Sequence, residues 1–335
     1  MTEQTQLAWD IIETTNTNLF LTGKAGTGKT TFLRRLKEES SKRIVVVAPT
    51  GIAAINAEGV TIHSFFQLSF APFIPNYNLK EQQFRFSKQK INVIRSIDTL
   101  VIDEISMVRA DLLDAVDSVL RRFRKNNLPF GGVQMVMIGD LGQLAPVAKD
   151  DEWQMLSRYY ATPYFFSSLA LQRTRYAIVE LTKVYRQSDK RFLDILNKVR
   201  ENRADAAVLS ALNSRYIPGF KPRKEDGYIR LTTHNWQAQR INDHELELLP
   251  GKPYTYTATI EGKYPEMLFP TDETLTLKTG AQVMFVKNDS SADKAYYNGM
   301  IGTIAAIDAE GFTVTAKDTG ENIRVQPEQW DNTRY

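Results

Sequence analysis

The sequence predicts an α/β fold built around a parallel β-sheet. Three short runs of consecutive apolar residues have the composition of strands buried on both faces, which are typical of parallel sheets. They are residues 43–48, 97–102 and 133–138. A fourth apolar run, residues 18–22, leads into a glycine-rich loop, and apolar residues at helical spacing follow that loop. Strand, loop and helix in succession are the pattern of an open α/β sheet.

Length and composition limit the classes of protein that remain. The chain has 335 residues, of which 42% are hydrophobic, so we expect two or more domains with cores of their own. Its net charge of +3 permits a nucleic-acid partner without requiring one. The absence of cysteine excludes disulfides, thiol catalysis and cysteine-bound iron or zinc, and three scattered histidines argue against a dedicated metal site. Without a basic-then-apolar leader or a long apolar run, we expect a cytoplasmic protein.

The first element is a helix over residues 2–15. Thr2 is placed to cap it, and the apolar residues at positions 7, 8, 11 and 12 recur at helical spacing. Gln4 lies on the first turn, where its position alone indicates a polar residue in contact with solvent.

The glycine-rich loop after the first strand, residues 23–30, fits the pattern G-x-x-x-x-G-K-S/T. In such a loop successive backbone N–H groups converge on phosphate oxygens, and the following helix adds its positive end. Lys29 would reach the β- and γ-phosphates, and the Thr30 hydroxyl would bind Mg²⁺. A plain glycine turn is the alternative, but the strand-then-helix context favours a nucleoside triphosphate site. Its residues are Gly23, Ala25, Gly26, Thr27, Gly28, Lys29, Thr30 and Thr31.

The next polar groups follow the later strands. Asp103 and Glu104 end the strand at 97–102, where Asp103 would hold Mg²⁺ through water and Glu104 would orient and deprotonate the attacking water. A pair of carboxylates in contact with solvent is the alternative, which the phosphate loop makes less favourable. Gln143 follows the strand at 133–138 and is placed to sense the γ-phosphate.

Small polar residues follow the strand at 43–48. Residues 49–51 lie at the edge where open α/β sheets bind ligands, and residues 61–66 add short hydrogen-bonding groups. Phe65 could stack on a ligand, although the pattern by itself favours a core position for Phe65 and Phe66. Residues 67–90 interrupt the alternation of strands and helices and are interpreted as an insertion.

A second α/β unit is expected from residue 178 onward. The aromatic-rich residues 151–177 are interpreted as a junction between domains, and residues 178–182 and 228–233 as strands. Arg186 would ordinarily be a surface or salt-bridge residue, and residues 233–235 would ordinarily cap a helix. From about residue 250 the chain changes to short β-like runs separated by turn residues, which predicts a small β-barrel.

Three segments together resemble a known family. Residues 23–30, 103–107 and 139–147 resemble superfamily 1B helicases, and most of all the petite-integration-frequency (Pif-type) family of 5′→3′ DNA helicases, with RecD-like helicases as relatives. The resemblance implies ATP- and Mg²⁺-dependent movement along single-stranded DNA that unwinds forked duplex DNA, and quadruplex DNA is a further substrate that it allows. It also implies a monomer, which would be associated with the nucleoid in bacteria and nuclear or mitochondrial in eukaryotes.

The resemblance also assigns roles to individual residues. It makes Gln4 a reader of adenine and Arg186 an arginine finger beside the catalytic Lys29, Glu104 and Gln143. It makes residues 67–90 a wedge-bearing insertion. It assigns contacts with single-stranded DNA to Pro49, Thr50, Gly51, His63, Ser64, Phe65, Thr233, His234 and Asn235.

The fold that the resemblance implies has three parts. They are a first RecA-like domain at residues 1–155, the start of a second at 156–250, and an SH3-like β-barrel insertion at 251–335. The family's later His-x-Ser-Gln-Gly motif and Ser-Arg pair are missing from this sequence, so we expect the second RecA-like domain to be incomplete. Two other hypotheses stay open: an ATP- and DNA-binding fragment without productive unwinding, and a kinase with the same phosphate loop.

Overall fold

The structure is a computed structural model that describes residues 2–75, 86–185, 189–221, 228–261, 271–287, 289, 295–297, 299–308 and 310–329. The chain divides into two compact units, Met1–Tyr216 and Ile217–Arg334.

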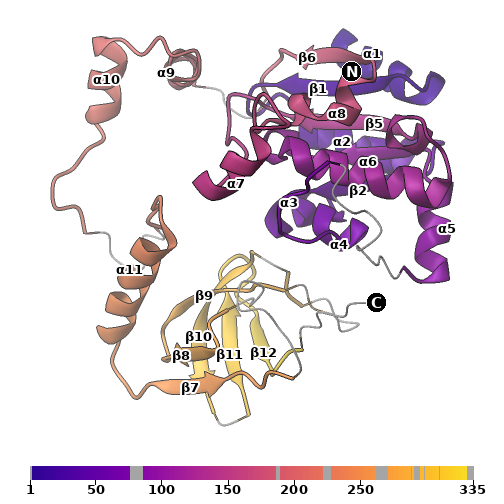
Figure 1. The fold of residues 1–335 in the computed structure, drawn as a ribbon. Coiled ribbons are helices and arrows are strands. Elements are labelled where there is room, and N and C mark those ends of the chain that lie inside the picture. Colours follow the sequence, from indigo (N-terminus) through magenta and orange to yellow (C-terminus); the bar gives the residue numbers. More distant parts are fainter. Residues whose placement is uncertain are drawn as a thin grey trace. The chain divides into compact units, whose positions relative to one another are not determined.

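The first unit is built on a six-stranded sheet with the order β3-β2-β4-β5-β1-β6 (Figure 1). All its neighbouring strands are paired in parallel. The strands are β1 (Asn18–Gly23), β2 (Ile44–Ala48), β3 (Val60–Thr61), β4 (Thr99–Ile102), β5 (Gln134–Gly139) and β6 (Tyr176–Leu181). The expected strands at 18–22, 43–48, 97–102 and 133–138 are therefore confirmed as β1, β2, β4 and β5.

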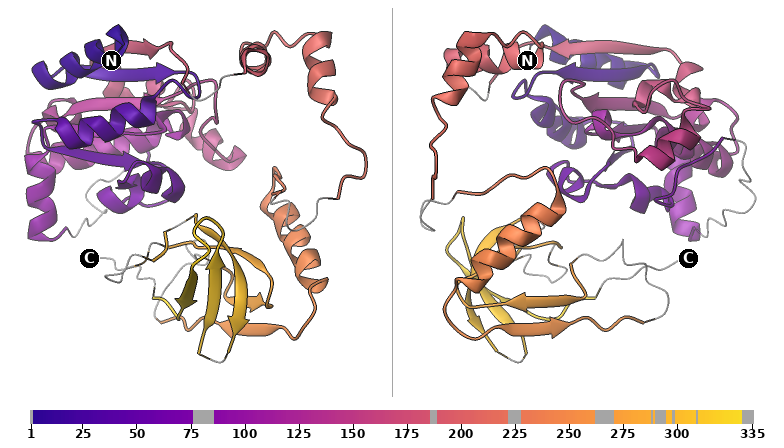
Figure 2. Two further views of the ribbon diagram at one scale, coloured as in Figure 1. Left: turned by 180° about the vertical axis from the view of Figure 1, so that it is seen from behind. Right: turned by 60° about the vertical axis from the view of Figure 1, so that its left-hand side comes forward.

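Helices cover both faces of this sheet (Figures 1 and 2). The α-helices of the unit are α1 (Glu3–Thr14), α2 (Lys29–Glu39), α3 (Gly51–Asn56), α4 (Ile62–Phe66), α5 (Lys88–Ser96), α6 (Ala110–Arg124), α7 (Asp150–Leu156), α8 (Leu169–Gln172), α9 (Lys190–Arg200) and α10 (Ala206–Asn213). The short 3-10 helices are η1 (Ile105–Met107), η2 (Pro129–Gly132) and η3 (Phe165–Ser167). Side chains alternate along each strand, so Leu19 and Leu21 pack with α1 and α2 while Phe20 packs on the face that α6 covers.

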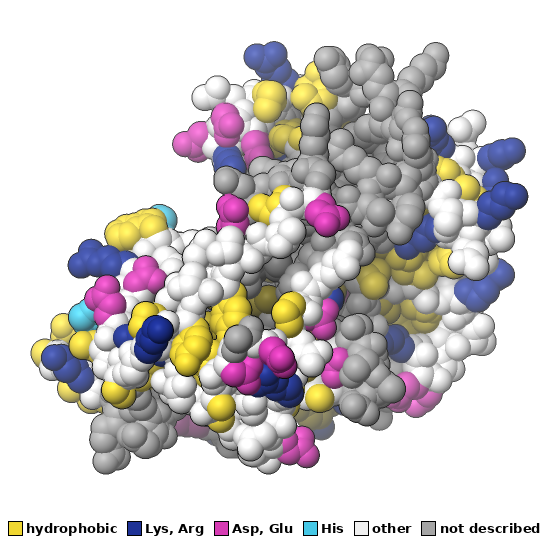
Figure 3. All heavy atoms as spheres, turned by 90° about the horizontal axis from the view of Figure 1, so that it is seen from below, with side chains coloured by type: hydrophobic (Ala, Val, Ile, Leu, Met, Phe, Trp, Pro, Cys, Tyr) yellow, Lys and Arg dark blue, Asp and Glu magenta, His cyan; other side chains and the backbone are white. Residues whose placement is uncertain are grey.

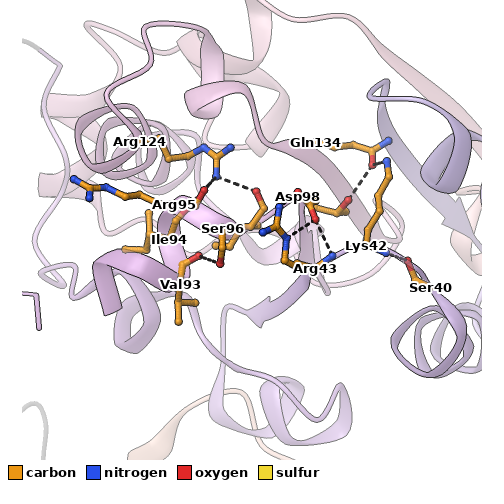
Figure 4. Close-up of polar contacts among 12 residues, drawn as sticks. Ser40, Lys42, Arg43, Val93, Ile94, Arg95, Ser96, Asp98, Arg124 and Gln134 are labelled. Atoms are coloured by element: carbon orange, nitrogen blue, oxygen red, sulfur yellow. Dashed lines mark hydrogen bonds and ion pairs between the residues drawn. The ribbon is translucent and has the colours of Figure 1, made fainter. Parts of the chain in front are cut away.

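The amino-terminal edge of the sheet is fixed by ion pairs and hydrogen bonds rather than by motif residues (Figure 4). Arg43, just before β2, donates to both carboxylate oxygens of Asp98, just before β4, at 2.8 and 2.7 Å. The guanidinium of Arg124, the last residue of α6, donates to the carbonyls of Ile94, Arg95 and Ile97 at 2.8 to 3.0 Å. These contacts join α5 and α6 to the start of β4.

Helix α6 carries three buried aspartates, Asp111, Asp114 and Asp117, each of which accepts backbone N–H groups from a different loop. Asp111 accepts from Phe73 at 2.9 Å, and Asp117 from Phe130. Asp114 accepts from Leu169 and Ala170 at 3.0 and 2.9 Å. Because each buried carboxylate satisfies N–H groups that would otherwise lack partners, α6 holds three connections in place at once.

Strand β6 corrects the prediction that residues 178–182 begin a second sheet. It pairs with β1 from Asn18↔Tyr176 to Gly23↔Leu181, beside the strand that leads into the phosphate loop (Figure 1). The aromatic residues before it are also part of the first unit, because Phe165 is buried with its ring 5.2 Å from that of Phe20. Large apolar rings gain most from burial, and here they attach residues 151–177 to the first sheet.

The second unit consists of a helix and antiparallel strands. It contains α11 (Asn235–Glu247), a strand pair β7 (Tyr254–Thr257) and β8 (Thr274–Leu277), and a sheet of order β12-β11-β10-β9. The four strands of that sheet are β9 (Gln282–Met284), β10 (Ile301–Ile307), β11 (Phe312–Ala316) and β12 (Asn322–Val325). The predicted short β-runs of this region are confirmed, and their core includes Phe285, Met300 and Val314.

The expected strand at residues 228–233 is wrong. The structure describes these residues, and none of them is in a strand. Leu231 is 87% exposed. None of the described strands pairs with these residues, so no sheet supplies the backbone hydrogen bonds that a strand requires.

On the face drawn in Figure 3, hydrophobic side chains lie exposed among acidic and basic ones. No helix in the described part of the chain has both the length and the apolar character that crossing a membrane requires.

Candidate functional site

The carboxyl ends of β1, β4 and β5 bring the predicted catalytic motifs together. These strands are neighbours in the parallel sheet, so the segments that follow them emerge at the same edge. The segments are the phosphate loop at residues 23–30, Asp103 with Glu104, and Asp140 to Gln143. These segments converge because of the order of the strands in the sheet, which brings together residues that are more than a hundred positions apart in the sequence.

The phosphate loop takes its shape from glycines at close approaches. A Cβ on Gly23 would lie 2.6 Å from the carbonyl oxygen of Leu181 and 2.7 Å from the Thr27 hydroxyl, so a side chain at position 23 would collide with β6. Gly28 has φ 91° and caps the amino end of α2 in the left-handed conformation. The Thr27 hydroxyl donates to the carbonyl of Lys24 at 2.8 Å, which closes the loop.

The ammonium of Lys29 lies over this loop. It donates to the carbonyl oxygens of Gly23 and Lys24 at 2.6 and 3.2 Å. Burial lowers the pKa of Lys29, while the carboxylates of Asp140, Glu104 and Asp103 oppose that shift. The Lys29 ammonium therefore lies among three acidic side chains, near the loop where phosphates are expected.

Asp103 and Glu104 stand at the end of β4. Burial raises the pKa of Asp103 to about 6, although its carboxylate accepts a hydrogen bond from the Glu104 N–H at 3.0 Å. Glu104 has φ 51° and ψ 44°, a left-handed conformation that is unusual for a residue other than glycine and that often marks functional sites. A Cβ on Gly139 would lie 2.9 Å from Cγ2 of Ile105, so the end of β5 packs closely against this turn.

Gln143 is held by Asp140, which is 1% exposed. The side-chain amide of Gln143 donates to the Asp140 carboxylate at 3.1 Å, the Gly142 N–H donates to it at 2.9 Å, and the guanidinium of Arg200 donates to it as well. Burial would raise the pKa of Asp140, but these hydrogen bonds and the charge of Arg200 lower it overall. Asp140 is therefore a buried carboxylate that stays ionised.

Sequence reasoning missed the roles of Asp140 and Arg200. Asp140 lies within residues 139–147, one of the segments that carry the family resemblance. A carboxylate two residues before a glycine in that segment could have indicated a role at the site. Arg200 ends α9, sixty residues later, on a helix whose pattern indicates only amphipathic packing. No feature of its own neighbourhood in the sequence reveals its partner.

The segment after β6 reaches the phosphate loop. The Tyr185 N–H donates to the carbonyl of Gly26 at 2.8 Å, and a Cβ on Gly28 would lie 3.6 Å from the Tyr185 ring. The next residue, Arg186, lies outside the described residues, so its predicted role as an arginine finger stays a prediction. Gln4 is half-buried on the first turn of α1, which Thr2 caps as expected through a hydrogen bond from the Thr5 N–H.

The predicted DNA contacts of the first unit follow β2 and β3. Pro49 and Thr50 lie between β2 and α3, and Gly51 is the first residue of α3. The Thr50 hydroxyl accepts a hydrogen bond from the Ala53 N–H at 3.2 Å. In α4 the His63 ring stacks on the exposed ring of Phe70, with centroids 4.5 Å apart, and Ser64 is exposed.

Phe65 differs from the others, because it is 6% exposed and packs in the core against Phe66. The Lys90 ammonium lies 3.4 Å from the centroid of the Phe65 ring. The core position that the pattern favoured is therefore confirmed. Residues 76–85 of the predicted wedge-bearing insertion at 67–90 lie outside the described residues.

The remaining predicted DNA contacts belong to the second unit. His234 is the N-cap residue of α11, and Asn235 is its first residue. The Thr233 hydroxyl and the His234 Nδ1 are 2.8 Å apart, and Trp236 beside them is 61% exposed.

Thr30 and Asp103 carry the type of oxygen group that Mg²⁺ prefers. Among the described residues no group of three or more histidines, cysteines or carboxylates is arranged to hold a metal by itself. Mg²⁺ at nucleotide sites is instead bound by one or two protein oxygens, phosphate oxygens and water. The Thr30 hydroxyl and the Asp103 carboxylate are hard oxygen ligands of this kind.

Comparison with known proteins identifies a family that the chain matches. The family model described as PIF1-like helicase matches residues 2–208. An ATP-dependent DNA helicase Pif1 from a Psychrobacter species is 37% identical over 324 residues, covering 91% of this chain and 46% of that protein. The chain therefore spans about half the length of that relative.

Solved structures are similar over nearly the whole chain. A Pif1 helicase from Bacteroides, crystallised with ADP-AlF3 and single-stranded DNA, is 41% identical with a TM-score of 0.85, covering 100% of this chain and 76% of that one. A structure of two coordinating Pif1 helicases at forked duplex DNA is 42% identical with a TM-score of 0.84, covering 99% of this chain and 78% of that one.

Proposed function

The chain belongs to the PIF1-like helicase family, and on that basis we propose that it hydrolyses ATP to move 5′→3′ along single-stranded DNA and unwind duplex DNA. The observation that carries the proposal is the meeting of Lys29, Glu104 and Gln143 at one edge of the sheet, in the electrostatic field of Asp140. The similar Bacteroides protein was crystallised with a nucleotide analogue and single-stranded DNA, which supports the same pair of ligands here.

In the proposed reaction each residue acts on a different part of the triphosphate. Backbone N–H groups of residues 23–30 and the Lys29 ammonium bind the phosphates, and Gln4 reads the adenine. Mg²⁺, held by the Thr30 hydroxyl and, through water, by Asp103, would neutralise charge on the β- and γ-phosphates. Glu104 orients the attacking water and accepts its proton. Gln143 senses the γ-phosphate, and Arg186 stabilises the charge that develops on it.

DNA binding is proposed to use mainly hydroxyl and backbone groups. Thr50, Gly51, His63 and Ser64 are the proposed contacts in the first unit, with Pro49 shaping the loop; in the second they are Thr233, His234 and Asn235. Contacts to the phosphate backbone are insensitive to sequence and weaken as salt rises.

The finer fold assignments also belong to the proposal. We propose that the strands of the second unit form an SH3-like barrel and that α9 to α11 are the start of a second RecA-like domain. The division at residues 155 and 250 stays a prediction, and the pairing of β6 with β1 favours moving the first boundary beyond Leu181. A monomeric state is proposed as well, with two coordinating copies, as in one similar structure, as the alternative. The cellular compartment also remains a proposal.

The decisive experiment measures ATP hydrolysis with and without single-stranded DNA. A translocase should hydrolyse ATP many times faster when an oligothymidine is present, because DNA binding completes its cycle. A kinase with the same phosphate loop should show no such stimulation. Unchanged ATP turnover in the presence of DNA would contradict the proposed function.

A further inference from the structure

The carboxyl end of α9 contacts two loops of the nucleotide site through opposite charges. Arg200, the last residue of the helix, forms an ion pair with Asp140, whose carboxylate also holds Gln143. Glu201, the next residue, forms an ion pair with Lys24 of the phosphate loop at 3.2 Å. One helix end is thus joined to both the phosphate loop and the Gln143 loop.

Gly142 makes room for the first of these contacts. A Cβ at this position would lie 2.5 Å from Nη1 and 2.7 Å from Cζ of Arg200, so the guanidinium occupies the space that a side chain would fill. Gly142 is not among the residues with positive φ, which means that alanine suits its backbone. Glycine at position 142 is therefore explained by the approach of Arg200 and not by a strained turn.

The ion pair between Arg200 and Asp140 determines which cation compensates the charge of the buried Asp140 carboxylate. The charge of the Asp140 carboxylate raises the pKa of Lys29, whereas the charge of Arg200 lowers it. If Arg200 were removed, the Asp140 charge would remain in a poorly solvated place and would attract Lys29 more strongly. The ammonium would then be drawn away from the phosphates.

The other residues of α9 do not form a hydrophobic core that the ion pair between Arg200 and Asp140 could stabilise. None of the helix's residues is buried, and Phe192, Leu196 and Val199 are each at least 40% exposed. A salt bridge used only to dock this helix would not need to end on the carboxylate that positions Gln143.

We propose that Arg200 is a positioning residue for ATP: by pairing with Asp140 it fixes Gln143 and lets the Lys29 ammonium stay over the phosphate loop. The inference rests on the proposed function, because it assigns a role within the same site. It also ties α9 to the nucleotide, since a shift of Asp140 or Lys24 would move the end of this helix.

The first test compares three variants in steady-state ATP hydrolysis. Arg200→Ala should raise the KM for ATP about tenfold, equivalent to about 1.4 kcal/mol, and change kcat by less than about threefold. Arg200→Lys, which keeps the charge, should stay within about threefold of the parent KM. The matched control is Lys198→Ala on the same helix, since Lys198 pairs with Asp194 and Asp205 and should leave the KM unchanged.

The second test asks whether the effect passes through Asp140. Adding Asp140→Asn to Arg200→Ala removes the uncompensated charge and should return the KM to within about threefold of the parent value. Gly142→Ala, which displaces the guanidinium, should raise the KM like Arg200→Ala and add little when the two are combined. A purely structural role would instead lower the thermal midpoint of all these variants without any rescue by Asp140→Asn.

Two outcomes overturn the proposal: a KM for Arg200→Ala equal to that of the parent, or full additivity of Gly142→Ala and Arg200→Ala. Failure of the proposed function would look different. In that case single-stranded DNA would not stimulate the parent protein, while the comparison of KM values in basal hydrolysis would still report on Arg200.

Discussion

At the scale of single residues, the chemistry depends on what surrounds Lys29. Its ammonium is half-buried and donates to two carbonyls of its own loop, and three carboxylates keep its charge favourable despite burial. These carbonyl and carboxylate groups limit the positions that the Lys29 ammonium can take, so the ammonium stays near the phosphate loop.

Replacement of Lys29 by alanine should abolish ATP hydrolysis. The change removes the cation that is proposed to neutralise the β- and γ-phosphates. We expect turnover to fall by at least about a hundredfold, as for loss of a transition-state contact of about 3 kcal/mol. Initial rates of phosphate release measure the effect. Lys37→Ala is the control, since Lys37 lies on the same helix but pairs with Glu58. Hydrolysis within a few-fold of the parent rate would contradict the assignment.

Replacement of Glu104 by glutamine should separate binding from turnover. Glutamine has the size of glutamate but cannot accept the proton of the attacking water, so the variant should bind ATP normally and hydrolyse it at least about a hundredfold more slowly. Equilibrium binding of a fluorescent ATP analogue and single-turnover hydrolysis measure the two steps. If Glu104→Gln turned over ATP at the parent rate, another group would have to be the base.

Residues that follow a strand within a motif were predictable from the sequence. Lys29, Asp103, Glu104 and Gln143 lie in the segments that follow β1, β4 and β5, and parallel strands bring such segments to one edge of the sheet. Arg200 was not predictable, because its partner is set by where α9 packs. The buried aspartates of α6 were hidden for a similar reason, since their partners are backbone N–H groups of distant loops.

At the scale of elements, α6 contributes to stability through polar contacts as much as through its apolar stripe. Asp114 accepts hydrogen bonds from the Tyr160 hydroxyl at 2.9 Å, from the Ser168 hydroxyl, and from the N–H groups of Leu169 and Ala170. These bonds attach α8 to the middle of α6.

Asp114→Ala should destabilise the first unit by about 3 kcal/mol, because a buried N–H group, a partly buried N–H group and the buried Tyr160 hydroxyl lose their acceptor. Urea unfolding followed by circular dichroism measures the loss. Glu38→Ala on the exposed side of α2 is a suitable control and should change the free energy of unfolding by less than about 0.5 kcal/mol. A loss below about 1 kcal/mol for Asp114→Ala would mean that water replaces the carboxylate.

The ion pair between Arg43 and Asp98 should make the join of β2 and β4 sensitive to acid. The hydrogen bond from Arg43 is the largest cause that lowers the pKa of Asp98, which falls to about 2. A lowered folded-state pKa means that the stabilisation is present above about pH 4 and is lost as the pH falls toward 2. Both side chains face solvent, so we expect only about 0.5 to 1 kcal/mol at pH 7.

The measurement is the free energy of unfolding in urea for the parent and for Asp98→Asn at several pH values. The difference should be constant from pH 7 to about 5 and should shrink below about pH 4. Arg43→Gln should give the same pH dependence, because it removes the other partner. A difference that stayed constant down to pH 2.5 would show that the pair is not the cause.

The placement of β6 marks the limit of prediction at this scale. Its apolar residues correctly indicate a strand, but the residues of a strand do not determine which other strand it pairs with. The alternation was informative in hindsight, since Ile178 is 63% exposed while Val179 and Leu181 are buried, as suits the outer strand of a sheet. That pattern fits the edge of the first sheet as well as the start of a second.

At the scale of the whole molecule, the chain combines an α/β unit that contains a parallel sheet with a unit of antiparallel strands. The sequence predicted both architectures, because long apolar runs followed by motif residues and short runs between turn residues are distinct patterns. It could not predict the strand order, which depends on contacts between distant segments.

Unwinding should depend on which strand of a partial duplex carries the tail. The proposed 5′→3′ movement requires a single-stranded 5′ tail for loading, so a 5′-tailed duplex should be unwound with ATP and a 3′-tailed duplex of the same sequence should not. Separation of labelled strands by gel electrophoresis measures this. Equal unwinding of the two substrates would contradict the polarity, and ATP hydrolysis without strand separation would favour the hypothesis of a binding fragment.

The pairing of β6 with β1 also determines where a minimal nucleotide-binding fragment can end. A fragment cut at residue 155 would uncover one side of β1 from Asn18 to Gly23, leaving backbone groups open to pairing with other copies. Expression of such a piece would invite aggregation. A fragment that is to stay dispersed should extend past Leu181, and one that extends past Tyr185 would also keep the hydrogen bond from the Tyr185 N–H to the Gly26 carbonyl.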